Sequence, residues 1–158
     1  MNVYEKFDLA KLLYENKYAG RGIVIGTTPD GTKSAVAYFI MGRSNNSRNR
    51  VFFENGEEVI IYPFDASKVE DPSLIIYSPI RKYQNNLIVT NGDQTDTIYD
   101  GLVKGESFSD ALTKREFEPD APNFTPRISG MLTFDDGDFT YQMSILKSAD
   151  PEGTACNR

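Results

Sequence analysis

Histidine is absent from the 158-residue chain, and cysteine occurs once, as Cys156. Without histidine, the chain lacks the usual general base, the Ser-His-Asp triad and the commonest zinc ligand. A single cysteine excludes an intrachain disulfide and a multi-cysteine metal site, and Cys156 in its polar tail is expected to be an inert thiol. Any chemistry must therefore rest on Arg, Lys, Tyr, Asp, Glu, Asn or backbone amides.

Long apolar runs and an excess of positive charge are also missing. No run approaches the roughly 20 residues that span a bilayer, and the segment "MNVYEKFDLAKLL" has acidic residues where a secretory signal would have a basic start and an apolar core. The 23 acidic against 17 basic residues give a net charge of −6, which argues against general binding to nucleic acid or anionic membranes. We expect a cytoplasmic protein that catches any anionic ligand with a local patch.

The patterning predicts a single α+β domain over residues 1–158, with mainly antiparallel sheets and few helices. Apolar residues at helical spacing predict two helices, over residues 5–16 and 107–116. Apolar runs bounded by turn signals predict hairpins and strands, over residues 22–42, 51–64, 73–80, 86–92 and 128–146. The first hairpin is almost continuously apolar and should be buried on both faces. Residues 147–158 show no periodicity and are expected to form a mobile tail.

The loop "MGRSNNSRNR" at residues 41–50 concentrates three guanidinium groups, from Arg43, Arg48 and Arg50, among serines and asparagines. Guanidinium groups bind phosphate through paired charge-assisted hydrogen bonds, and small polar residues let backbone amides approach an anion. The alternative is a solvated loop whose arginines pair with surface carboxylates. The composition alone leaves both interpretations open.

Three further polar segments flank predicted strands. Arg21 stands between two glycines in "YAGRG", and Arg127 follows a rigid proline in "NFTPRISG". The segment "TNGDQTD" at residues 90–96 is either a turn with Asx-type bonds or a cluster of donors and carboxylates for a base or sugar. The glycines match neither the dinucleotide-binding nor the P-loop pattern.

Taken in order, "YAGRGIVIG", "AVAYFIMGRSNNSRNR", "LIIYSPIR", "LIVTNGDQTD" and "NFTPRISG" resemble the archaeal-type IMP cyclohydrolases, a family also found in some bacteria. The resemblance extends from Tyr18 to about Tyr141. It implies a four-layer αββα sandwich related to the N-terminal-nucleophile hydrolases, although this sequence shows no processed nucleophile at its Met1 start. It also implies ring closure of 5-formamidoimidazole-4-carboxamide ribonucleotide to IMP and water in de novo purine synthesis. No cofactor or metal is implied, and the implied partner is a purine ribonucleoside monophosphate.

Carried over motif by motif, the resemblance implies roles for ten residues. The implied catalytic residues are Arg48, Tyr77 and Glu118. The implied substrate contacts are Arg21, Arg43, Ser44, Asn91, Asp93, Thr95 and Arg127, with structural support of the site as the alternative for each. Within the loop, Arg43 and Arg48 are expected to point into the cleft and Arg50 to be structural.

Family members continue beyond the point that matches "YQMSILKS", so part of the sandwich is expected to be missing or replaced. One alternative function is a purine nucleotide-binding protein without this chemistry. Another is N-terminal-nucleophile amidohydrolysis, which needs a Cys, Ser or Thr freed at a new N-terminus. A homo-oligomer is left open.

Overall fold

The computed structural model describes residues 5–69 and 76–158. The helical elements are α1 (Leu9–Glu15), α2 (Asn45–Arg48), the 3₁₀ turn η1 (Ala66–Lys68), α3 (Gln94–Val103) and α4 (Phe108–Leu112). The strands are β1 (Arg21–Thr27), β2 (Ser34–Ile40), β3 (Val51–Asn55), β4 (Glu58–Tyr62), β5 (Tyr77–Tyr83), β6 (Asn86–Thr90), β7 (Arg127–Asp135), β8 (Asp138–Ser148) and β9 (Cys156–Asn157). No helix in the described ranges is both long and apolar enough to cross a membrane.

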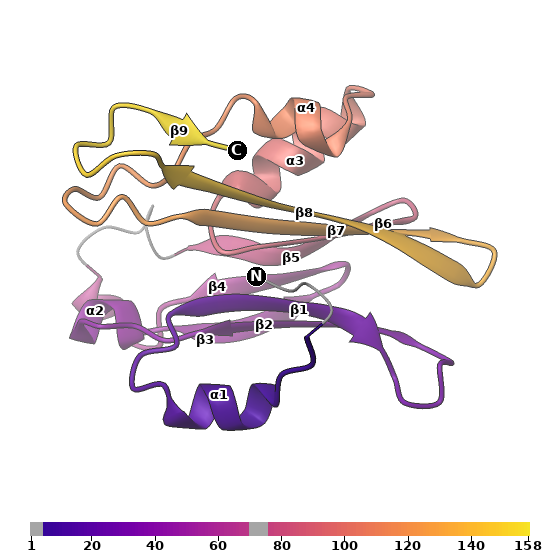
Figure 1. Ribbon diagram of the computed structural model, residues 1–158, viewed down its shortest axis with the longest axis horizontal. Coiled ribbons are helices and arrows are strands. Elements are labelled where there is room, and N and C mark those ends of the chain that lie inside the picture. Colours follow the sequence, from indigo (N-terminus) through magenta and orange to yellow (C-terminus); the bar gives the residue numbers. More distant parts are fainter. Residues whose placement is uncertain (1–4, 70–75) are drawn as a thin grey trace.

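Two antiparallel sheets form the centre of the molecule. Strands β3 to β9 make a seven-stranded sheet in sequence order, and β1 and β2 pair as a separate hairpin. Figure 1 shows α3 and α4 on one side of the large sheet, the β1–β2 hairpin on the other, and α1 beyond the hairpin. The α+β class and the antiparallel pairing are therefore confirmed, and the layers agree with a sandwich.

The main core lies between the large sheet and helices α3 and α4. Ile98 of α3 packs with Phe108 and Leu112 of α4 against sheet residues that include Ile88 and Leu146. Each of these five side chains is at most 3% exposed. Burial of a large aliphatic or aromatic side chain contributes about 1.5–3 kcal/mol, so this cluster is a principal source of stability.

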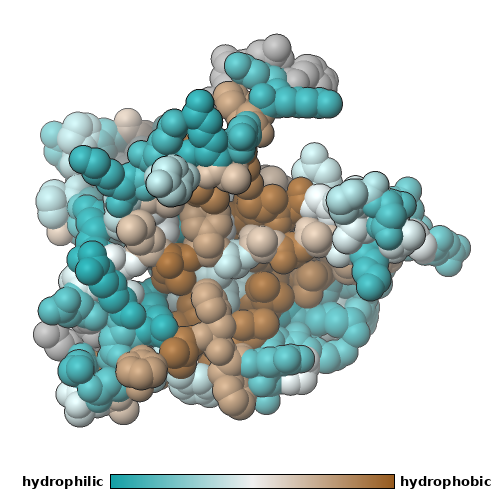
Figure 2. Space-filling view, turned by 90° about the horizontal axis from the view of Figure 1, so that it is seen from below, coloured by the Kyte–Doolittle hydropathy of each residue, from teal (hydrophilic) through white to brown (hydrophobic). Residues whose placement is uncertain are grey.

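The hairpin β1–β2 packs on the opposite face of the large sheet, with β1 across β7 and β2 across β6. A glycine at position 130 permits this contact, because a Cβ there would lie 2.9 Å from Ile25 Cδ1. The outer face of the hairpin is open, and Val24 is 37% exposed. The expectation that this hairpin is buried on both faces is therefore wrong. Figure 2, seen from below, shows apolar side chains gathered on this side of the molecule.

The three predicted hairpins and both predicted helices are present, although the helices are shorter than expected. Helix α3 was not predicted, because "QTDTIYDGLV" is polar and contains a glycine. Tertiary contact explains that glycine, since a Cβ on Gly101 would lie 2.6 Å from Ala111 Cβ of α4. Of the strand predicted at 73–80, residues 73–75 lie outside the described residues, and β5 begins at Tyr77.

The tail at residues 147–158, for which the sequence predicted mobility, is folded. Strand β8 continues to Ser148, and β9 pairs with its last two residues. The carboxylate of Asp150 accepts hydrogen bonds from the backbone amides of Glu152, Thr154 and Ala155. A local carboxylate turn of this kind leaves no periodic signal in the sequence.

Replacing Ile98 with alanine should reduce the free energy of unfolding by about 2–5 kcal/mol, because it opens a cavity in the α3–α4 core. Val103→Ala on the same helix is the matched control, since Val103 is 52% exposed. Urea unfolding should show a change within about 0.5 kcal/mol for the control. Equal losses in the two variants would contradict this location of the core.

Candidate active site

Two adjoining cavities lie at the end of the molecule where α2 is labelled in Figure 1. The inner cavity, of about 180 Å³, is lined by Arg21, Tyr77, Gly92, Asp93, Glu118, Pro119, Asp120 and Arg127. The loop cavity, of about 420 Å³, is lined by residues that include Tyr18, Arg21, Arg43, Ser44, Ser47, Arg50, Asp120, Asn123 and Thr125. Because Arg21 and Asp120 line both, the two cavities form one cleft.

Arg21, the first residue of β1, joins the hairpin to two other segments. Its guanidinium donates to both carboxylate oxygens of Glu118, at 2.9 and 3.2 Å, and to the backbone oxygen of Asn91 at 2.5 Å. The side chains of Arg21 and Glu118 are only 22% and 17% exposed. Burial opposes the charge on Arg21, yet Glu118 holds the pKa of Arg21 above its usual value. The inner cavity therefore contains a fixed, paired cation and carboxylate.

The loop that carries Glu118 is braced by Thr125. The Glu118 amide donates to the Thr125 carbonyl at 2.9 Å, and the Asp120 carboxylate accepts from the Thr125 amide and hydroxyl. These contacts hold Glu118 in place from its own side, while Arg21 holds it from the hairpin. A carboxylate fixed in this way is oriented before any ligand enters.

Tyr77, the first residue of β5, lines the inner cavity. Its oxygen lies 2.8 Å from the hydroxyl of Tyr38 on β2, and either phenol can be the donor. Burial raises the pKa of Tyr77 and of Tyr38 above the usual value for a phenol. Both groups are therefore neutral at physiological pH and can donate hydrogen bonds.

Asp93 is held by two arginines at the far wall of the inner cavity. Its carboxylate pairs with Arg127 at 2.6 Å and with Arg115 at 2.5 Å. Arg127 also donates to the Gln94 side chain at 2.9 Å. Burial opposes ionisation, but the two guanidinium groups hold the pKa of Asp93 below its usual value. Asp93 is thus a fixed carboxylate.

Gly92 allows the side chains of Gln94 and Arg127 to pack closely against the backbone in this wall of the cavity. A Cβ at this position would lie 2.7 Å from Gln94 Oε1 and 2.9 Å from Arg127 Nη1. Any larger residue would displace the polar groups that form the wall. The turn "TNGDQTD" therefore brings Asp93 and Arg127 to the cavity by close backbone approach.

The arginine loop is arranged differently from the expectation. Arg43 and Arg50 line the loop cavity, whereas Arg48 is exposed, does not line it, and donates from Nε to the Gly42 carbonyl at 3.0 Å. Arg50 rather than Arg48 thus faces the cleft, because α2 turns the Arg48 side chain back onto its own loop.

Serine side chains set the shape of this loop. Ser44 and Ser47 exchange hydrogen bonds, in which the Ser44 amide donates to Ser47 Oγ at 2.9 Å and the Ser47 amide donates to Ser44 Oγ at 3.0 Å. Arg43 lies over the Tyr18 ring, with its guanidinium carbon 5.0 Å from the ring centre. Arg43 and Ser44 line the loop cavity from the two positions directly before α2.

Asn91 and Thr95, two of the predicted substrate contacts, do not line the inner cavity. The Asn91 side chain donates to the Pro126 carbonyl at 2.8 Å and accepts from the Ile128 amide at 3.0 Å. The Thr95 hydroxyl is 2.6 Å from that of Thr90, and both threonines are fully buried. Their geometry matches the alternative of structural support.

Sequence reasoning did not single out Tyr38, Arg115 or Asp120 as site residues. Tyr38 lies within the quoted segment "AVAYFIMGRSNNSRNR", directly before the arginine loop, and that position was the available signal. Arg115 belongs to the segment 107–116 predicted as a helix but lies beyond the observed end of α4, and Asp120 stands in the proline-bearing loop that follows. Only the fold brings that loop against β1 and α3.

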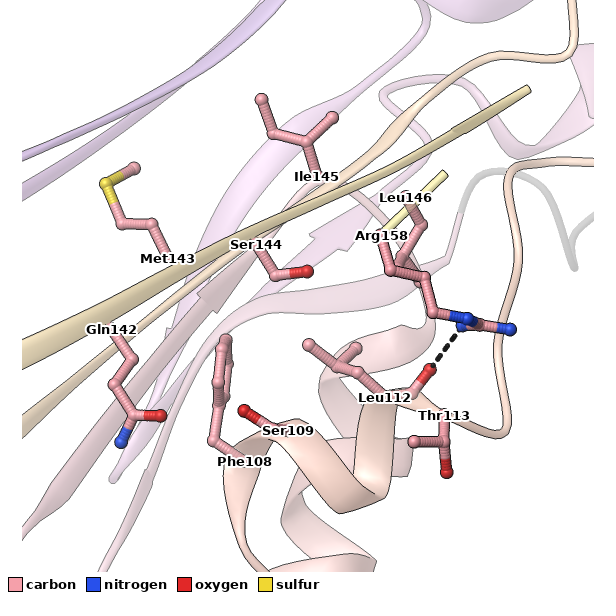
Figure 3. Close-up of a pocket in the computed structure, with 10 residues that line it drawn as sticks. All are labelled: Phe108, Ser109, Leu112, Thr113, Gln142, Met143, Ser144, Ile145, Leu146 and Arg158. Carbon is pink, nitrogen blue, oxygen red and sulfur yellow. Dashed lines mark hydrogen bonds between the residues drawn. The ribbon is translucent and has the colours of Figure 1, made fainter. Parts of the chain in front are cut away.

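A larger groove than either cavity, of about 690 Å³, lies elsewhere, between α4 and β8. Figure 3 shows Phe108 and Leu112 on one side of it and β8 residues on the other. Arg158 also lines this groove, and its guanidinium donates to the backbone oxygens of Leu112 and Arg115. None of the predicted site residues lines this groove. Among the described residues, no group of three or more His, Cys, Asp or Glu is placed to hold a metal ion.

The protein has an α+β fold, and both arginines and carboxylates line its cleft. The chain belongs to the IMP cyclohydrolase-like protein family, whose model matches residues 18–157. It is 34% identical over 119 residues to the IMP cyclohydrolase of Methanococcus aeolicus, covering 73% of this chain and 58% of that protein. It is 35% identical over 116 residues to the enzyme of the same name from Methanopyrus kandleri, covering 71% and 57%. The chain thus spans somewhat more than half the length of these relatives.

The Asp93 ion pairs predict a pH dependence of stability. Because the pKa of Asp93 is lowered in the folded state, its contribution to the free energy of unfolding is present above the unfolded pKa of about 4 and is lost as the pH falls through the lower folded value. Asp93→Asn should therefore be less stable than the wild type at pH 7, and the difference should shrink at pH 3. Urea unfolding at both pH values measures it, and an unchanged difference would contradict these ion pairs.

Proposed function

We propose that this protein is an IMP cyclohydrolase that closes the ring of 5-formamidoimidazole-4-carboxamide ribonucleotide to give IMP and water. The observation that carries the proposal is the two-part cleft, where fixed Arg21, Glu118 and Tyr77 adjoin an arginine loop. Membership of the IMP cyclohydrolase-like family supports the same activity. The likeness to N-terminal-nucleophile hydrolases, the cytoplasmic location and the homo-oligomer stay predictions.

In this proposal the loop cavity binds the 5′-phosphate. A protein with net charge −6 needs a local cationic site for a phosphate dianion, and Arg43 and Arg50 with the Ser44 hydroxyl provide one. Arg48 contributes by holding the Gly42 carbonyl and so the shape of the loop. The sugar then spans the shared wall at Arg21, and the imidazole lies in the inner cavity.

The reaction joins two groups of one molecule, so the substrate itself supplies much of the effective molarity. The carboxamide nitrogen attacks the formyl carbon and gives up one proton, while negative charge develops on the former formyl oxygen. That oxygen then leaves as water, taking up two protons in all, one from each of the two nitrogens that become bonded to the carbon. The protein has to orient the groups, stabilise the oxygen and move these protons.

The inner cavity contains groups for each of these tasks. Tyr77 is a neutral donor and Arg21 a cation, so both can stabilise the developing oxyanion. Glu118, held by two bonds from Arg21, can take the proton from the attacking nitrogen and pass it to the oxygen. Asp93 and Arg127 form the opposite wall and are proposed to contact the carboxamide. Asn91 and Thr95 hold this wall rather than touch the substrate.

The purified protein should convert the formamido ribonucleotide to IMP. The rise in IMP absorbance, compared with a buffer control, measures this conversion. Glu118→Gln keeps the shape of the side chain but removes its base, so kcat should fall by about a hundredfold.

Tight binding of IMP in calorimetry with no turnover would instead support a purine nucleotide-binding protein. An unprocessed N-terminus in intact-mass spectrometry would remove N-terminal-nucleophile amidohydrolysis.

Arg50→Ala and Arg48→Ala test the assignment of the loop arginines. Loss of a phosphate contact should raise KM or the IMP dissociation constant by at least about tenfold in Arg50→Ala. Arg48→Ala is the matched control from the same loop and should change either constant by only a few-fold. The reverse order, measured by calorimetry with IMP on folded variants, would show that Arg48 holds the phosphate.

A further inference from the structure

The Tyr38–Tyr77 contact joins the two sheets of the sandwich directly behind the inner cavity. Tyr38 belongs to the β1–β2 hairpin and Tyr77 to the large sheet, and their hydroxyl oxygens are 2.8 Å apart. Tyr77 is 6% exposed and lines the cavity, whereas Tyr38 does not line it. The Tyr38 ring is held edge-on against Phe52, with ring centres 6.1 Å apart. Tyr38 therefore reaches the cavity only through Tyr77.

Each phenol has a single hydrogen, so the direction of the shared bond decides what Tyr77 presents to a ligand. If Tyr38 donates to Tyr77, the hydrogen of Tyr77 is available to the cavity. If Tyr77 donates to Tyr38, the cavity meets only a lone pair. Burial raises the pKa of both phenols, so the pair retains both hydrogens at physiological pH and is not a phenolate base.

The charge that develops during the reaction favours one of these two hydrogen-bond directions. Negative charge develops on the former formyl oxygen, and a lone pair of Tyr77 pointed at that oxygen would repel it. A chain of two hydrogen bonds in the same direction strengthens the final one, because each bond polarises the next. Arg21 and its ion-pair partner Glu118 line the same cavity as Tyr77, so charges of both signs lie near the phenol pair.

We propose that Tyr38 is a positioning residue for this reaction: its hydroxyl donates to the Tyr77 oxygen and so directs the Tyr77 hydrogen at the former formyl oxygen of the substrate. The inference rests on the proposed cyclohydrolase function. No covalent bond of Tyr38 or Tyr77 breaks, since both phenols keep their hydrogens throughout. The protons of the reaction still travel from the two nitrogens to the departing water.

Tyr38→Phe tests this role because it keeps the ring and removes only the hydroxyl. Turnover, kcat, should fall by about tenfold with KM nearly unchanged, since the lost bond acts on the transition state. Tyr77→Phe should lower kcat at least as much. The double variant should be no slower than Tyr77→Phe alone, because Tyr38 acts only through Tyr77.

The matched control is Tyr99→Phe on α3, a phenol whose ring lies 3.5 Å from the Arg81 guanidinium and outside the cleft. This control should keep the wild-type kcat. Full activity in Tyr38→Phe, or losses that multiply in the double variant, would overturn the inference. An inactive wild type would contradict the proposed function instead.

A second measurement tests the pair without turnover. In protein labelled with ¹³C at tyrosine Cζ, the Tyr77 signal, assigned with Tyr77→Phe, should shift when Tyr38 becomes phenylalanine. It should shift again when IMP is added to the wild type. A Tyr77 signal that does not respond to Tyr38→Phe would overturn the inference whatever the activity assay shows.

Discussion

The paired contact between Arg21 and Glu118 is the constraint on which the cleft depends. It joins the first residue of the hairpin to the loop before β7, and the third bond of Arg21 reaches the backbone of Asn91, directly after β6. Three segments far apart in the sequence are thereby fixed around one cavity. Losing these bonds would leave a partly buried guanidinium unpaired, which is costly, so they favour one position of the hairpin on the large sheet.

The other parts of the site follow from that position. When the hairpin is docked, Tyr38 meets Tyr77 across the two sheets, and β2 leads directly into the arginine loop. Gly130 makes the close approach possible, since a side chain there would collide with Ile25. The same packing that closes the sandwich thus creates both the neutral phenol pair and the cationic loop cavity.

The sequence predicted the α+β class and the three hairpins, because turn residues and apolar runs are local signals. Its resemblance to the family also named Arg21, Tyr77, Asp93, Glu118 and Arg127 as candidates, and these five line one cavity. It could not predict helix α3, where Gly101 is explained only by contact with Ala111. Nor could it rank Arg48 against Arg50, because the turn of α2 decides which guanidinium faces the cleft. The partner of Tyr38 likewise depends on how the two sheets are stacked.

The central claim is that one cleft holds a purine nucleotide, with its phosphate at the arginine loop and its base beside Tyr77 and Glu118. A crystal structure of the protein with IMP tests this most directly. We expect phosphate oxygens within hydrogen-bond distance of Arg43, Arg50 and Ser44, and the hypoxanthine ring in the inner cavity. Density for IMP in the groove between α4 and β8, or a phosphate held by Arg48 alone, would contradict it.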